Sequence, residues 1–210
     1  MRKINILLFL LVVVCSLKAQ YAGYSLINDP ASFKEKFSLA AQKNQSIKSD
    51  FVQEKSLSML SEKVVSKGKF WFKKDMVRLE YTHPYQYLMI MNRGNIFIKD
   101  GQKENKISVN SNKIFKQVNK ITVDCVQGTV LSNTDFRTRI FEGKNSYMIE
   151  LTPVAKGIKD LYKTINVIVD KKELSVMSIE MHEISGDNTS LHFLNKELNT
   201  NIPDAIFSIK

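Results

Sequence analysis

Most of this 210-residue chain alternates apolar and polar residues with a period of two, from Ser46 almost to the C-terminus. Successive side chains of a β-strand point to opposite faces, so this period predicts strands with one apolar and one wet face. The pattern is clearest in segments 76–81, 146–151 and 174–183. Their apolar positions are Val77, Leu79, Tyr81, Tyr147, Ile149, Leu151, Met177, Ile179 and Met181.

Short turn signals separate these segments at intervals of roughly ten residues. They are Lys67-Gly68, Lys74-Asp75, His83-Pro84, 92–95, Asp100-Gly101, 142–145, 170–172 and 185–188. About ten short strands joined by tight hairpins predict an antiparallel meander. Long helical segments between the strands are missing from the pattern, which argues against a parallel α/β sheet. The sequence has no internal repeat, low-complexity tract or linker, and so predicts one domain.

Two segments, and a third shorter one, read as helices instead. Asn28-Asp29-Pro30 is a helix start, and the apolar residues that follow it recur at helical spacing over 30–44. Ser111-Asn112 begins a second helix, and a short third one is expected over 157–163. The apolar positions of the first two are Phe33, Phe37, Ala40, Ala41, Ile114, Phe115, Val118 and Ile121.

The apolar face of the sheet requires a cover. A sandwich would need a second sheet, and a closed barrel would fill its own interior with side chains. The helices are the elements left to do this. We therefore predict a mainly β fold, an incomplete, half-open antiparallel β-barrel lidded by two or three α-helices. Periodicity leaves open whether the space beneath the lid is solid core or cavity.

The N-terminus predicts export. Arg2 and Lys3 precede an apolar run over 6–14, which has the length of a signal-peptide core and is too short for a membrane-spanning helix. We expect a signal peptide over 1–19, cleaved after Ala19 or Gln20, and one domain over 20–210 in the periplasm. The alternatives are an N-terminal membrane anchor and lipid modification at Cys15.

Charge and cysteine usage narrow the partners. Removal of 1–19 lowers the formal net charge from +10 to +7, since Arg2, Lys3 and Lys18 leave without an acid. An exported basic chain meets anionic membrane surfaces and acidic partners, and its lysines are scattered along strands, which argues against nucleic acid. Cys125 becomes the one remaining thiol, so no internal disulfide is possible. Its apolar neighbours predict a buried hydrophobic role.

The sequence shows no catalytic or metal-binding pattern. The three histidines are His83, His182 and His192, and none has a partner at ligand spacing. Phosphate-binding loops, nucleophile elbows and dinucleotide-binding turns are also absent from the sequence. We therefore expect no enzymatic activity, no cofactor and no metal.

The order of residues from Ser46 onward resembles the periplasmic outer-membrane lipoprotein carrier (LolA) family. The landmarks are SIKSDFVQE at 46–54, GKFWFKK at 68–74, VRLEY at 77–81, Pro84, Gly94, IFI at 96–98, LTP at 151–153, and Ile202-Pro203 followed by Phe207. One departure stands out. Lys74-Asp75 replaces the Arg-Pro of the family, and that arginine latches the helical lid. Lysine lacks the planar fork of arginine, so Lys74 would be a weaker latch.

The resemblance implies a monomeric carrier that shields lipoprotein acyl chains between an inner-membrane transporter and an outer-membrane acceptor. Expected cavity residues are Phe51, Val77, Leu79, Tyr81, Tyr147, Ile149, Met177, Ile179 and Met181. Expected lid residues are Phe33, Phe37, Ile114, Phe115 and Val118, with Lys74 as the latch. Two alternatives stay open. One is a carrier of the same fold for another amphiphile, such as a glycolipid or polyene. The other is an envelope scaffold whose apolar face is simply core.

Overall fold

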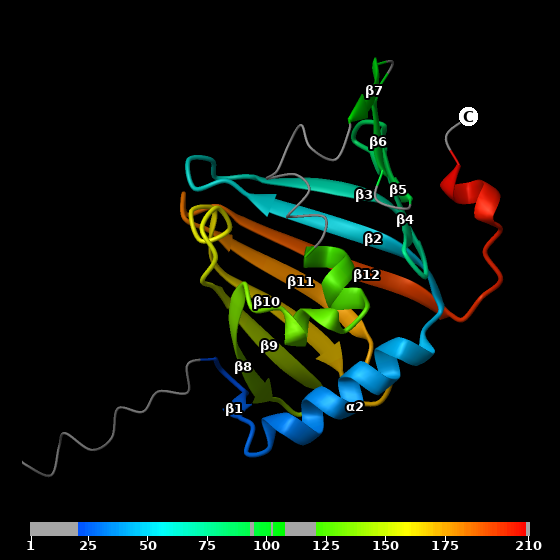
Figure 1. Cartoon of the computed structure of the whole chain (residues 1–210). Coiled ribbons are helices and arrows are strands. Elements are labelled where there is room, and N and C mark those ends of the chain that lie inside the picture. The colour runs from blue at the N-terminus through cyan, green and yellow to red at the C-terminus, as the bar shows by residue number, and fades with distance from the viewer. Residues whose placement is uncertain (1–20, 93–94, 102, 108–120, 209–210) are drawn as a thin grey trace, which may run out of the picture.

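The computed structural model describes residues 21–92, 95–101, 103–107 and 121–208 (Figure 1). The expected signal peptide at 1–19 and the expected lid residues Ile114, Phe115 and Val118 lie outside these ranges. In chain order the elements are β1 (Ser25–Leu26), α2 (Pro30–Lys43), β2 (Ser46–Ser56), β3 (Lys63–Lys73), β4 (Met76–His83), β5 (Tyr87–Asn92), β6 (Asn95–Asp100), β7 (Lys103–Ile107), the 3₁₀-helix η1 (Thr129–Ser132), β8 (Phe136–Glu142), β9 (Ser146–Pro153), β10 (Tyr162–Asp170), β11 (Val176–Glu183), β12 (Asn188–Leu198) and the 3₁₀-helix η2 (Asp204–Phe207).

The described strands form one antiparallel sheet in the order β1-β8-β9-β10-β11-β12-β2-β3-β4-β5-β6-β7. Most consecutive strands pair as hairpins, whereas β1 pairs with β8, and β12 returns to lie beside β2 in the middle of the sheet. The two edges, β1 and β7, do not pair with each other among the described strands, so the sheet curves without closing. The predicted half-open meander is confirmed. In Figure 1 this curved sheet wraps around α2 and a second helical segment.

Helix α2 begins where the sequence predicts. The Asp29 side chain accepts a hydrogen bond from the Ser32 N–H at 3.0 Å, and Pro30 occupies the first turn. Phe33 and Phe37 are buried and their rings stack with centroids 5.7 Å apart, while the Phe33 ring lies 4.6 Å from that of Tyr147. The aromatic stripe therefore fixes α2 across one end of the concave face.

The second helical segment, residues 121–126, lies across the middle of the concave face (Figure 1). Ile121, Val123, Cys125 and Val126 are all buried. Gly128 then takes a φ of +72°, and a Cβ at this position would lie 2.7 Å from the Ala41 Cβ of α2. A glycine lets the chain leave this helix in close contact with α2.

The third helix expected over 157–163 does not form. Residues 156–161 make turns, with the Leu161 and Tyr162 N–H groups both bonded to the Ile158 carbonyl, and β10 begins at Tyr162. Only the last two residues of this segment, Tyr162 and Lys163, belong to β10, and Tyr162 pairs there with Glu183 of β11. Among the described residues, no helix is both long and apolar enough to cross a membrane.

A second, smaller core lies on the convex face. Ile202 and Phe207 are buried there against Ile90 and Phe97. Three side chains hold the segment down by donating to its backbone carbonyls. Lys73 bonds to Ile202, Arg78 to Ile206 and Asn92 to Phe207. The Ile-Pro…Phe landmark at 202–207 is thus a strap across the outside of β3–β5.

Candidate functional site

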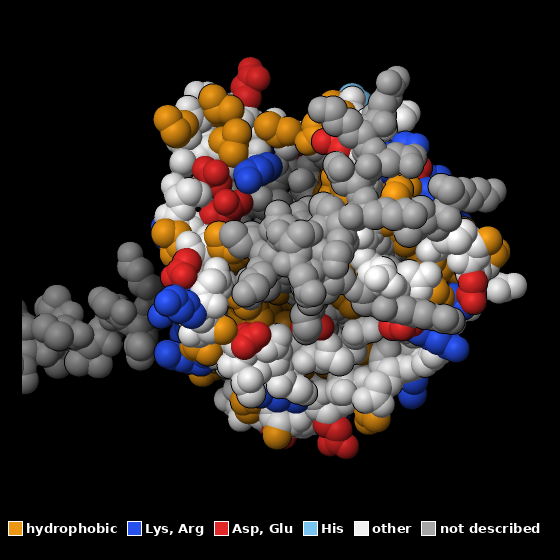
Figure 2. Space-filling view, turned by 45° about the horizontal axis from the view of Figure 1, so that its top comes forward, with side chains coloured by type: hydrophobic (Ala, Val, Ile, Leu, Met, Phe, Trp, Pro, Cys, Tyr) orange, Lys and Arg blue, Asp and Glu red, His pale blue; other side chains and the backbone are white. Residues whose placement is uncertain are grey.

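The concave face of the sheet and the two helices enclose an apolar interior, which we call the trough. Where Figure 2 leaves this face visible, hydrophobic side chains lie toward its middle, and most charged side chains lie nearer its margin. Of the predicted cavity residues, Phe51, Val77, Ile149, Ile179 and Met181 are buried in the main core. Leu79, Tyr81 and Tyr147 are partly buried and pack against it.

Met177 is the exception, and its predicted inward position is wrong. Its side chain is 41% exposed, whereas Val176 beside it is buried. The register explains this. Ser178 pairs with Ile168 and Val176 pairs with Val169, so Met177 is the extra residue of a β-bulge. The extra residue shifts the alternation of inward and outward side chains by one position, so Val176 instead of Met177 points inward at the start of β11.

One cavity in the trough lies between the 121–126 helix and the sheet, with a volume of about 70 Å³. Its walls are Gln53, Phe70, Val77, Leu79, Tyr81, Met89, Thr122, Val123, Met181 and Leu191. Sites for drug-sized ligands are typically ~300–1,000 Å³. This cavity is therefore several times smaller than such a site.

A narrow crevice of about 10 Å³ lies further along the same helix, beside Val126. Phe70 borders both spaces, whereas Val123 faces the cavity and Val126 faces the crevice. The crevice is completed by Phe37, Asn44, Ile47, Leu174, Ser175, Val176, Phe193 and Lys196. The 121–126 helix therefore lines both small spaces, with Phe70 of the sheet common to the two.

Polar groups gather where the trough meets the strand ends. The Tyr81 hydroxyl donates to Gln53 Oε1 at 2.8 Å. Burial, with a smaller contribution from nearby Tyr85, raises the pKa of Tyr81 to about 12, so this phenol stays protonated and remains a donor. Further along the rim, Lys55 forms a 3.3 Å ion pair with Glu183.

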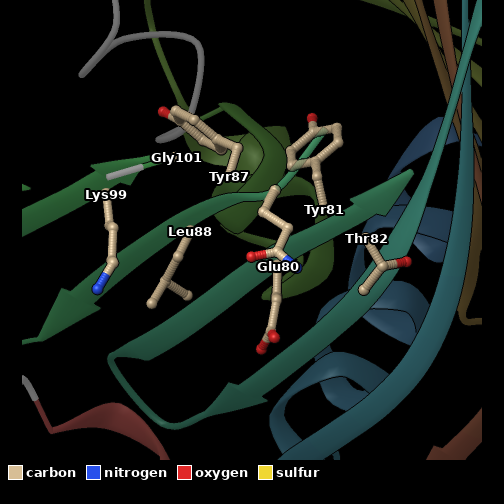
Figure 3. A pocket seen from close by; sticks show the side chains of 8 residues that line it. Glu80, Tyr81, Thr82, Tyr87, Leu88, Lys99 and Gly101 are labelled. Atoms are coloured by element: carbon tan, nitrogen blue, oxygen red, sulfur yellow. The ribbon is translucent and has the colours of Figure 1, made fainter. Parts of the chain in front are cut away.

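An open groove of about 210 Å³ adjoins this end of the trough (Figure 3). It wraps around the ends of β4, β5 and β6. Tyr81 and Tyr87 lie on one side of the strands, and Glu80, Leu88 and Lys99 point to the other. Tyr81 lines both this groove and the inner cavity, and its ring packs edge-on against Tyr87 at 5.6 Å. Tyr81 thus lies between the groove and the inner cavity.

Lys74 does lie near the lid, but its backbone makes the contact. The residue has a φ of +56° and an exposed side chain. Its carbonyl accepts a hydrogen bond from Gln127 Nε2 at 2.8 Å, and its N–H donates to the Gln45 carbonyl at 3.1 Å. Because these hydrogen bonds use the Lys74 backbone, they form equally well with arginine or lysine at this position.

Sequence reasoning missed several residues that line the trough. Phe70 and Phe72 alternate with Trp71 in β3, so the same period-two argument could have placed both phenylalanines inside. Val123 and Val126 lie beyond Ile121, the last apolar position of the predicted second helix, and its spacing did not include them. Gln127 carried no signal, because its role depends on a turn that lies far away in the sequence.

Chemically, the trough offers apolar surface and few hydrogen-bonding groups. Within the ranges that the structure describes, no three His, Cys, Asp or Glu side chains group closely enough to hold a metal ion. His182 is engaged by Asn166 and Asn188 on the convex side. Cys125 has no exposed surface, and burial raises the pKa of its thiol far above the ordinary value, which disfavours the nucleophilic thiolate.

Comparison with known proteins points to one family. The sequence profile described as outer membrane lipoprotein carrier protein LolA matches residues 42–210. A search among curated proteins found no match.

Among solved structures, a LolA superfamily protein from Nitrosomonas europaea is 12% identical, with a TM-score of 0.45 over 85% of this chain and 96% of that one. A chain of the Pseudomonas aeruginosa MucA/MucB complex is 10% identical, with a TM-score of 0.51 over 85% of this chain and 60% of that one. The Mycobacterium tuberculosis lipoprotein LppX is 14% identical, with a TM-score of 0.42 over 83% and 98%. At these identities the structures inform the fold alone.

Proposed function

The chain belongs to the outer membrane lipoprotein carrier (LolA) family, and from this premise we propose that it carries acyl chains through the cell envelope in its trough. The cargo class that the family membership favours is the lipoprotein. The observation that supports this proposal most directly is the cover of the concave face. Among the described residues, the 121–126 helix, rather than a second sheet, covers the middle of an apolar surface that extends over many strands.

A helical cover makes loading energetically feasible. An acyl chain in water costs about 0.8 kcal/mol per methylene, so a carrier must bury most of its length. Without cargo, Val123 and Val126 occupy the trough and shield its lining. When a chain enters, it takes the place of these side chains on the same surface. The gain from burying the chain is partly offset by exposing the helix, which keeps the net affinity modest enough for release.

The setting and partners that we propose follow from family membership. The chain acts in the periplasm after removal of 1–19, as a monomer that receives cargo from an inner-membrane transporter and delivers it to an outer-membrane acceptor. We also propose that it catalyses no reaction and needs no cofactor. Burial raises the pKa of the Cys125 thiol and so disfavours it as a nucleophile, which is in line with the absence of catalysis in this proposal.

A scaffold or adaptor role is the second candidate, and a specific observation favours it. The cavity of about 70 Å³ holds far less than an acyl chain, as expected if the interior is permanent core. The fold is also shared with a chain of a protein–protein complex, MucA/MucB. A scaffold would keep the 121–126 helix in place at all times.

The variant Val123→Glu separates the two functions. Val123 is 7% exposed and faces the cavity, and an unpaired charge there costs several kcal/mol if the helix cannot move. If the helix is a lid, it can turn the carboxylate into water, so the protein keeps a melting temperature close to that of the wild type. It then loses retention of a fluorescent fatty-acyl ester, a probe without charge of its own.

The control is Val154→Glu, which makes the same change at a side chain that is 45% exposed and lies away from the trough. It should leave melting and binding unchanged. A folded Val123→Glu protein with lost binding supports the carrier. Loss of cooperative melting supports the scaffold, and a wild-type protein that does not bind the ester excludes the carrier.

A further inference from the structure

Lys196 is a cation placed at the inner side of the sheet by an irregularity in β12. The register of β12 against β2 shifts between Leu194 and Glu197, and Asn195 has a φ of +52°. Along β12, the side chains that point inward are therefore those of Leu191, Phe193 and Lys196, whereas regular alternation would have placed Asn195 there. Because of this bulge, the Lys196 side chain lines the crevice beside the 121–126 helix.

The Lys196 ammonium makes only neutral hydrogen bonds within the described chain. It donates to Ser175 Oγ at 2.5 Å and to the Val176 carbonyl at 3.0 Å, which leaves its third N–H without a partner there. Burial lowers its pKa, and the charges of Glu173 and Asp170 partly counteract that effect. A half-buried ammonium beside apolar walls and without a carboxylate in direct contact is poorly compensated.

The trough has a suitable length beyond this cation. Leu191 borders the cavity and Lys196 borders the crevice, and the five residue steps between them span roughly 16 Å of strand. This distance is comparable with a long extended acyl chain. If the 121–126 helix is displaced, as the proposed carrier function requires, the cavity and the crevice join along β12, with Phe70 beneath both.

We propose that Lys196 is a binding residue for the acid group of an anionic, single-chain amphiphile, whose hydrocarbon lies along the trough toward Leu191 and Phe70. The proposal rests on the carrier function and adds to it a cargo class besides the lipoproteins, an amphiphile with a free acid group. The carboxylate or other anion takes the third N–H of Lys196 and compensates its charge, while the chain covers the apolar lining. At the other end of the trough, Lys55 and Glu183 pair with each other, so this lysine does not need an anion from the ligand.

The test compares dodecanoate with dodecanol, which have the same chain and differ in the charge of the head group. Calorimetric titration of the full mature chain should show dodecanoate binding about tenfold more tightly, the size expected for a charge-assisted hydrogen bond. Lys196→Met should remove this preference and leave the affinity for dodecanol unchanged. Lys196→Arg should retain the preference. Lys159→Met, which removes the same charge at an exposed position, should behave as the wild type.

Each outcome is decisive. An undiminished preference in Lys196→Met overturns the proposal, as does an equal loss of affinity for both ligands, which would show a structural role. Equal binding of both ligands by the wild type refutes the head-group assignment alone and leaves the carrier function standing. If the wild type binds neither dodecanoate nor dodecanol, the carrier function itself is refuted. If Lys196→Met does not fold, Lys196→Gln replaces it, because glutamine keeps hydrogen-bond donors and removes the charge.

Discussion

At the scale of single residues, Gly68 is the most closely packed of the described glycines. A Cβ there would overlap the Glu80 carbonyl oxygen and lie 2.6 Å from Cζ of Phe51. The backbone oxygen belongs to the paired strand β4 and cannot move without breaking the ladder. We expect Gly68→Ala to lower the free energy of unfolding by at least about 3 kcal/mol, the upper end of overpacking costs, as measured by urea unfolding.

Gly101→Ala is the matched control for this prediction. Gly101 has a φ of +56°, and a Cβ added to it would meet no atom within 4 Å beyond its chain neighbours. The cost there is conformational alone, about 1 kcal/mol. Equal losses in the two variants would mean that Phe51 and the Glu80 carbonyl pack against Gly68 less closely than these distances indicate.

At the scale of elements, the thiol of Cys125 can report whether the 121–126 helix moves. Cys125 has no exposed surface, and the high pKa of its buried thiol further slows attack on reagents. In the mature chain, where Cys125 is the one thiol, it should react with a maleimide many-fold more slowly than in urea. Saturating dodecanoate should accelerate the reaction if cargo displaces the helix. Binding of dodecanoate with unchanged labelling would contradict a moving helix.

At the scale of the whole molecule, the continuous sheet predicts one cooperative unfolding unit. Trp71, the one tryptophan of the chain, lies on the convex side of β3, with the Arg78 guanidinium 5.6 Å from its ring. Far along the sheet, Glu150 is 1% exposed and is bound by Arg139 and the Tyr21 hydroxyl. Arg139→Met leaves that carboxylate without its cation and should cost about 2 kcal/mol.

The loss should shift the unfolding midpoint equally in Trp71 fluorescence and in far-ultraviolet circular dichroism. Arg139→Lys, which keeps the charge, should shift both less. A Trp71 transition that stays at the wild-type midpoint would show that the β3–β7 part of the sheet unfolds separately from β8–β11.

Much of the fold and part of the site could be predicted from the sequence. Local alternation identified the meander and the inward positions of Val77, Ile149 and Ile179, because side-chain direction in a strand follows from its own period. The start of α2 was predictable because capping by Asp29 is a contact between residues three positions apart. Order and spacing of landmarks also indicated the family.

What only the tertiary structure decided depends on residues that are distant in sequence. Met177 turns outward and Lys196 inward because of bulges that exist only in the pairing with neighbouring strands. The strap of Ile202 and Phe207 on the convex face needs side-chain donors from β3, β4 and β5. The small volume of the cavity is likewise set by how side chains from the helix and many strands meet in three dimensions, and a pattern of apolar residues along the chain does not specify that volume.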